Sequence, residues 1–295
     1  MPHILKNKNL EIIIDLPDEN YRETRFDWSG KIIEVKFDEI IFGTTELPDI
    51  ANQYEHGRGF YNEFGIDSPL GFEETKKGEW FHKIGVGLLK KEGMVYNFIN
   101  SYDLLPCDFS IQKNAASIQF ECTSELVNGY AYSLKKVITL LESGFQINYF
   151  LKNIGDKIIE TNEYNHNFLA IGIESMNPNY VLKLPFELDT DSFKENINPE
   201  QLVQFKNNQL GFSNTPKEVF FFSYLNGTEK IQASWKLENS KLNVGVEECG
   251  DFLTSKINLW GWKHVISPEL FFEIKLQRGE SVSWSRTYDF YKLKP

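Results

Sequence analysis

Residues 145–151, with the sequence FQINYFL, indicate most clearly how this chain folds. In an extended segment Phe145, Ile147, Tyr149 and Leu151 share one face, and Gln146 and Asn148 take the other. This period of two is typical of a β-strand with one buried side and one wet side. The break ESG at 142–144 joins this run to the similar run 132–141, as in a β-hairpin.

Similar short runs recur along the chain and predict further strands. Breaks at 239–240 and 278–280 are short enough to connect antiparallel neighbours directly. The sequence therefore predicts an all-β protein, a large antiparallel β-sandwich, with residues 1–295 in a single domain. The additional runs expected to form strands are 31–37, 117–122, 219–224, 231–237, 241–246, 270–276 and 281–288.

Helical signals are weak and confined to two places. Residues 199–205 and 48–54 each predict at most one or two helical turns. The stretch 177–214 contains three prolines and many polar residues, and is the least strand-like part of the chain. We expect it to form loops at one edge of the sandwich, where loops often shape a ligand cleft.

Charge and composition narrow the class of ligand and the location. The net charge is −11, from 31 basic and 42 acidic residues, and no basic cluster forms a phosphate-binding patch. This argues against a nucleic-acid partner and favours a neutral small molecule such as a sugar.

The three cysteines, Cys107, Cys122 and Cys249, form no CxxC pair. Residues 1–8 lack the apolar run of a secretory signal and no segment is long enough to span a bilayer, so we expect a cytoplasmic protein with no membrane partner.

His166, in the sequence EYNHNFL at 163–169, is the first candidate catalytic residue. An imidazole with an unperturbed pKa of about 6.5 suits proton transfer near neutral pH. Its neighbours Tyr164, Asn165 and Asn167 could hydrogen-bond a polyhydroxylated ligand. A lone histidine on a strand also fits a purely structural role.

Glu269 is the second candidate, because it follows Pro268 within an apolar run that would bury it in part. Burial raises a carboxyl pKa toward the range of a general base. Trp260 and Trp262, two residues apart, could stack on a sugar ring, but they equally fit a pair of core tryptophans. Arg58, in the glycine-rich block EHGRGFYNEFG at 55–65, could bind sugar oxygens or could pair with a nearby carboxylate.

Motifs for dinucleotides, phosphate loops, zinc proteases and serine hydrolases are missing from the sequence. What remains is acid–base chemistry by histidine and carboxylate, which requires no metal and no cofactor.

Four blocks, taken in order, resemble the aldose 1-epimerase (galactose mutarotase-like) superfamily. They are GRGF at 57–60 with EFG at 63–65, HKIGVGLL at 82–89, YNHNF at 164–168, and ISPE at 266–269 followed by LQRGES at 276–281. The chain looks like a divergent member, since Lys83 and Ile84 separate His82 from Gly85 and Arg278 replaces the usual turn proline. The resemblance implies a β-sandwich made of antiparallel strands.

The resemblance also implies roles for individual residues. Glu269 would take the proton of the anomeric hydroxyl while His166 protonates the ring oxygen, and His82 would assist. Arg58 would help to bind the sugar. The function that follows is that of an aldose 1-epimerase, acting on an aldose that is free or phosphorylated. A non-catalytic sugar-binding protein of the same fold is the alternative, and a lyase or hydrolase domain is a third and weaker one, because the helical partner domain of such enzymes is missing.

Overall fold

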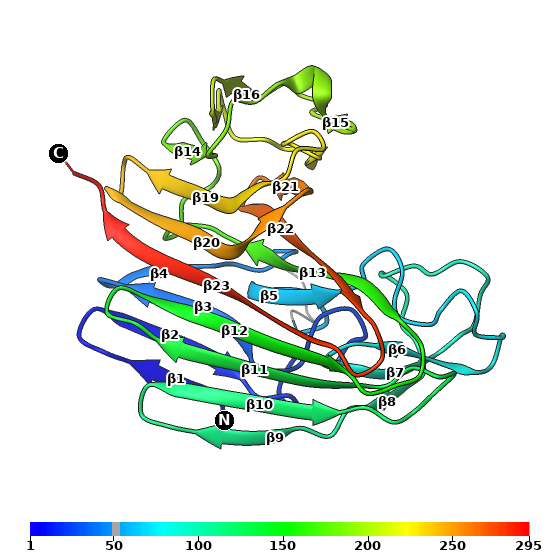
Figure 1. Cartoon of the computed structure of the whole chain (residues 1–295). Helices are drawn as coiled ribbons and strands as arrows, with labels where there is room; N and C mark the ends of the chain where they lie inside the picture. The colour runs from blue at the N-terminus through cyan, green and yellow to red at the C-terminus, as the bar shows by residue number, and fades with distance from the viewer. Residues whose placement is uncertain (49–53, 295) are drawn as a thin grey trace.

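The computed structural model describes residues 1–48 and 54–294, and two large sheets dominate it (Figure 1). Each sheet has ten strands, and neighbouring strands run antiparallel, so the predicted all-β fold class is confirmed. The first sheet has the order β1 (His3–Lys6), β2 (Leu10–Asp15), β3 (Lys31–Phe37), β5 (Gly59–Phe64), β13 (Ile159–Phe168), β22 (Val265–Leu276), β21 (Ile257–Trp262), β18 (Phe220–Ser223) and β15 (Glu195–Ile197), with β4 (Ile40–Phe42) beside β3.

The second sheet lies against the first, and a small third sheet lies to one side of the pair (Figure 1). The second sheet has the order β16 (Val203–Lys206), β17 (Gln209–Phe212), β14 (Tyr180–Lys183), β19 (Ile231–Asn239), β20 (Val244–Thr254), β23 (Ser281–Lys292), β12 (Gly144–Asn153), β11 (Tyr132–Leu140), β10 (Ser117–Thr123) and β9 (Ser110–Lys113). The third sheet is formed by β6 (Trp80–Lys83), β7 (Gly87–Lys90) and β8 (Leu104–Pro106).

Strand β12 contains the predicted run 145–151 and shows the expected alternation. Phe145, Ile147, Tyr149 and Leu151 are buried, whereas the polar positions between them are partly exposed. The hairpin to β11 and the remaining predicted strands are also present, with several changes of boundary, such as the start of β22 at Val265 and the end of β23 at Lys292. Residues 240–243 form a turn, so the strand expected at 241–246 begins only at Val244.

The stretch 177–214 is more regular than the sequence predicts. It contributes β14, β16 and β17 to the second sheet and β15 to the edge of the first. The expected helical turns at 199–205 are wrong, because Gln201 has a φ of 53° and the chain then enters β16. A left-handed residue cannot continue a right-handed turn. The other expected helical segment, 48–54, lies almost entirely outside the described residues.

Helical structure in the described ranges is limited to one 3₁₀ turn, η1 (Thr190–Ser192). None of the helical structure there is long and apolar enough to cross a membrane.

Apolar side chains form two cores, one on each face of the first sheet. The larger core fills the space between the two ten-stranded sheets and includes Phe60, Phe145 and Tyr288. The smaller core lies on the opposite face of the first sheet and includes Phe168 and Phe26. Strand β13 therefore has packed side chains on both sides.

A buried ion-pair group crosses the larger core. Arg286 on β23 places Nη2 2.7 Å from Glu163 Oε2 and Nη1 2.8 Å from Glu248 Oε1. Its Nη2 also donates to the carbonyl of Leu270 at 2.8 Å. All three charged side chains are fully buried, so each depends on the others for compensation of its charge. This group connects β23 to β13, β20 and β22.

Removing the cation should be strongly destabilising. Arg286→Leu would leave Glu163 and Glu248 buried without a counter-charge, and we expect the free energy of unfolding to fall by about 3–5 kcal/mol. Urea denaturation of the purified variant measures this change, and a variant that fails to fold shows the same effect in the extreme.

The matched control is Arg278→Leu, which breaks the surface pair between Arg278 and Asp156, whose side chains are 75% and 57% exposed. We expect a loss of roughly 0–1 kcal/mol there. Equal losses for the two variants would contradict the assigned role of the buried pair.

Candidate active site

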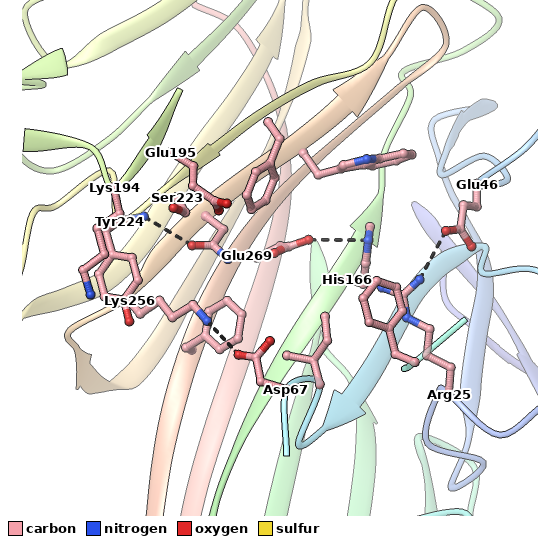
Figure 2. Close-up of a pocket in the computed structure, with 16 residues that line it drawn as sticks. Arg25, Glu46, Asp67, His166, Lys194, Glu195, Ser223, Tyr224, Lys256 and Glu269 are labelled. Carbon is pink, nitrogen blue, oxygen red and sulfur yellow. Dashed lines mark hydrogen bonds and ion pairs between the residues drawn. The ribbon is translucent and has the colours of Figure 1, made fainter. Parts of the chain in front are cut away.

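A cavity of about 700 Å³ opens on the face of the first sheet that points away from the second sheet. Strands β13, β22, β21, β18 and β15 contribute to its lining, together with residues outside the strands that include Arg25, Glu46, Asp67, Phe98, Lys194, Tyr224 and Lys256. In Figure 2, His166 and Glu269 lie between Arg25 and Glu46 on one side and Lys194, Tyr224 and Lys256 on the other. The volume of the cavity is typical of sites that bind small molecules.

His166 on β13 and Glu269 on β22 face each other across the two strands. Pairing of Tyr164 with Phe271 and of Leu169 with Ile266 sets a single register, in which His166 lies opposite Glu269. His166 Nε2 is 3.4 Å from Glu269 Oε1, and each side chain is only 5% exposed. The structure thus brings the two predicted proton carriers together in one cavity.

Pro268 explains why the strands separate locally beside this pair. A proline has no N–H to donate to the neighbouring strand. The carbonyl of Pro268 instead accepts a hydrogen bond from Asn167 Nδ2 at 2.8 Å. On the cavity side the Ser267 hydroxyl lies 2.9 Å from His166 Nδ1 and fixes the ring. A side-chain amide therefore takes the place of a backbone donor at this point, and the hydroxyl orients the imidazole.

Burial sets the charge of the pair. It raises the pKa of Glu269 to about 8, although Arg25, Lys256 and a hydrogen bond from Asn258 favour the carboxylate. Burial also lowers the pKa of His166 well below its usual range, and Arg25 lowers it further. Near neutral pH the cavity therefore holds a protonated Glu269 beside a neutral imidazole, and the pair carries one exchangeable proton.

Arg25 is the main cationic side chain next to His166. It donates to Glu63 Oε2 at 2.9 Å and to Glu46 Oε1 at 3.2 Å. Its guanidinium lies 4.5 Å from the ring centre of Phe26 and 4.4 Å from that of Phe98. Two carboxylates and two aromatic rings therefore hold its position.

Several solved structures have the same architecture as this chain over nearly its whole length. A galactose mutarotase related enzyme from Lactobacillus acidophilus superposes with a TM-score of 0.63 at 10% identity, over 100% of both chains. The Slr1438 protein of Synechocystis sp. PCC 6803 gives 0.63 at 12% identity, over 99% of this chain and 96% of the other. A galactose mutarotase-like protein from Clostridium acetobutylicum gives 0.60 at 11% identity, over 98% and 95%.

The chain has the galactose mutarotase-like fold. No protein-family profile and no curated protein sequence match the chain.

Within the galactose mutarotase-like fold, the asparagines beside His166 point away from the cavity. Asn165 donates to the hydroxyl of Tyr288, and Asn167 Nδ2 donates to Glu248 Oε2 at 3.1 Å. The reason is the period of two, which turns neighbours of His166 toward the second sheet. The predicted sugar-binding role of Asn165 and Asn167 does not fit this orientation, because both are fully buried between the sheets.

Tyr164 has the same parity as His166, but it lies beneath the cavity surface. Its hydroxyl donates to Glu63 Oε2 at 2.7 Å and is 3.3 Å from Arg25 Nη2. The side chain is fully buried and its ring stacks on Phe271, which lines the cavity. Tyr164 thus supports Arg25 rather than presenting its hydroxyl to a ligand, in contrast to the prediction.

The glycine-rich block around Arg58 has a packing role in the galactose mutarotase-like fold. A Cβ on Gly57 would lie 2.2 Å from the ring of Phe168, which stacks on His166 with ring centres 4.1 Å apart. Arg58 is half-buried, its charge acts on Asp15 and Tyr61, and it does not line the cavity. The predicted sugar-binding arginine is therefore placed elsewhere, and Arg25 occupies the cavity instead. No local pattern in the sequence distinguishes Arg25 from Arg22.

His82 on β6 is also placed outside the cavity. Its Nε2 is 3.0 Å from the carbonyl oxygen of Tyr130, and its ring makes an edge contact with Tyr132. Burial lowers its pKa to about 4, so it is a neutral imidazole in the interior. The structure does not bring His82 to His166, and a direct role in proton transfer has no geometric support.

The two tryptophans of β21 have different surroundings. Trp260 lines the cavity, with its ring centre 5.4 Å from that of His166. Trp262 lies beyond the cavity, where its Nε1 donates to the carbonyl of Lys217 at 2.7 Å. Only Trp260 is placed where it could stack on a ligand near the pair.

The raised pKa of Glu269 predicts a specific dependence of stability on pH. Between about pH 4.5 and pH 8 the unfolded chain loses this proton while the folded chain keeps it, so this residue makes the native protein less stable as pH rises. Glu269→Gln removes this contribution. We expect the stability of the variant relative to the native protein to increase from pH 5 to pH 8, as measured by urea denaturation. A difference that stays constant over this range would contradict the burial of a protonated carboxyl.

Proposed function

We propose that the protein is an aldose 1-epimerase that interconverts the α and β anomers of a sugar by acid–base ring opening. The observation that carries the proposal is the His166–Glu269 pair, with Nε2 and Oε1 3.4 Å apart in a ligand-sized cavity. Both groups exchange protons, and they can act on two oxygens bound to the same carbon. The galactose mutarotase-like fold and the indole of Trp260 beside the pair support the same reaction.

The reaction needs one proton removed and one delivered. Glu269 takes the proton of the C1 hydroxyl, and the protonated His166 gives a proton to the ring oxygen. The bond between C1 and the ring oxygen then breaks, and its electrons stay on that oxygen as the C1 carbonyl forms. Rotation about the C1–C2 bond and reversal of the transfers produce the other anomer. The proton count of the pair is unchanged over one turnover.

The pair starts this sequence after its shared proton has moved from Glu269 to His166. Arg25 and Lys256 both favour the ionised carboxylate of Glu269. Arg25 also lowers the pKa of His166, which makes the imidazolium a stronger acid toward the ring oxygen.

Anomer exchange measured by polarimetry or NMR tests the proposal. A panel of free aldoses and their 6-phosphates should include at least one sugar whose mutarotation the native protein accelerates. His166→Ala and Glu269→Gln should each reduce kcat by about 10²–10⁴, because each removes one proton carrier.

The matched control is His3→Gln on the edge strand β1, outside the cavity, which should leave the rate unchanged. No acceleration for any sugar, or equal rates for the two cavity variants and the native protein, would contradict the enzyme proposal. Tight sugar binding without acceleration would instead support a sugar-binding protein of the same fold.

A further inference from the structure

A second cavity of about 420 Å³ adjoins the first and is not used by the reaction described above. The two cavities share three lining residues, Arg25, Glu46 and Phe98. Arg25 and Glu46 lie at one end of the first cavity, with His166 between them and the opposite end formed by Lys194 and Tyr224 (Figure 2). The second cavity therefore continues the first past His166.

The residues shared by the two cavities are held in position by contacts with one another and with their neighbours. The guanidinium of Arg25 contacts the rings of Phe26 and Phe98 and donates to Glu46 and Glu63. Glu46 accepts a further hydrogen bond from the backbone N–H of Gly57 at 3.1 Å. The positive charge of Arg25 is thus already compensated by two carboxylates. The Arg25 guanidinium therefore offers a ligand a flat surface in a fixed position, and it is not a free cation available to an anionic ligand.

The second cavity has open hydrogen-bonding capacity. The side chains of Glu55, His56 and Asn100 line it, and no hydrogen bond within the described part of the chain occupies them. Glu23 lies there as well, and its carboxylate accepts a bond from Ser101 at 3.4 Å. Carboxylates and an amide beside an aromatic ring suit the hydroxyl groups and apolar face of a sugar.

Charge distinguishes a neutral occupant from an anionic one. Three glutamates, Glu23, Glu46 and Glu55, line the second cavity, and Arg25 is the sole lysine or arginine among its lining residues. Because Glu46 and Glu63 compensate Arg25, a phosphate or carboxylate there would meet net negative charge. A neutral sugar unit avoids this repulsion.

We propose that the second cavity is a subsite for the second unit of a neutral reducing disaccharide. The inference rests on the proposed function, which requires the free anomeric centre at His166 and Glu269. The reducing ring then occupies the first cavity beside Trp260, and the linked unit passes Arg25 and Phe98 into the second cavity. The substrate class is a short neutral oligosaccharide with a free reducing end.

Binding of non-reacting analogues tests the subsite without turnover. Calorimetry should compare methyl glucoside with the methyl glycosides of maltose and cellobiose, and methyl galactoside with that of lactose. We expect at least one disaccharide glycoside to bind about tenfold more tightly than its matching monosaccharide glycoside. Ser101→Trp, at an exposed residue lining the second cavity, should remove this difference and leave monosaccharide binding unchanged.

The matched control is Ser110→Trp, the same change at an exposed serine on β9 outside both cavities, which should preserve the difference. Equal affinity for mono- and disaccharide glycosides, or an equal effect of Ser101→Trp on both, would overturn the subsite. Anomer exchange is measured separately, so an inactive protein that still prefers disaccharides contradicts the epimerase proposal and not the subsite.

Discussion

The buried guanidinium of Arg286 is the interaction on which the rest of the structure depends. It joins Glu163 on β13 to Glu248 on β20 and also binds the carbonyl of Leu270 on β22. Leu270 directly follows Glu269, and Glu163 begins the segment that contains His166. The same cation therefore sets the relative position of the two strands that carry His166 and Glu269. A charge buried this deeply is tolerated only while its partners remain in place.

Alternation along β13 separates structural chemistry from cavity chemistry. Glu163, Asn165 and Asn167 point between the sheets and bind polar groups of β20, β22 and β23. His166 points to the opposite face, where it meets Glu269 and Trp260. Because neighbouring residues of a strand face opposite sides, the polar residues flanking the histidine are unable to share its cavity. They instead fix the strand that presents it.

The electrostatics of the cavity follow from competition between burial and nearby cations. Burial favours a neutral pair, and it dominates for both Glu269 and His166. Arg25 and Lys256 act in the other direction on the carboxyl and favour its ionised form, whereas Arg25 adds to the effect of burial at the imidazole and favours its neutral form. Arg25 has this effect while remaining bound to Glu46 and Glu63, which keeps it at a fixed distance from the pair.

The sequence by itself determined many of the long strands and their alternation, and it singled out His166 and Glu269 as candidates, because these depend on local periodicity and on short motifs. Tertiary structure alone decided the rest of the cavity. Arg25 reaches it from a loop about 140 residues before His166, and its role depends on the buried Glu63 and Tyr164, which no local pattern reveals. Likewise Arg58 and His82 have residue types suited to a sugar site, yet packing directs them elsewhere. Side-chain chemistry is local, whereas the face and neighbours of a side chain result from long-range pairing of strands.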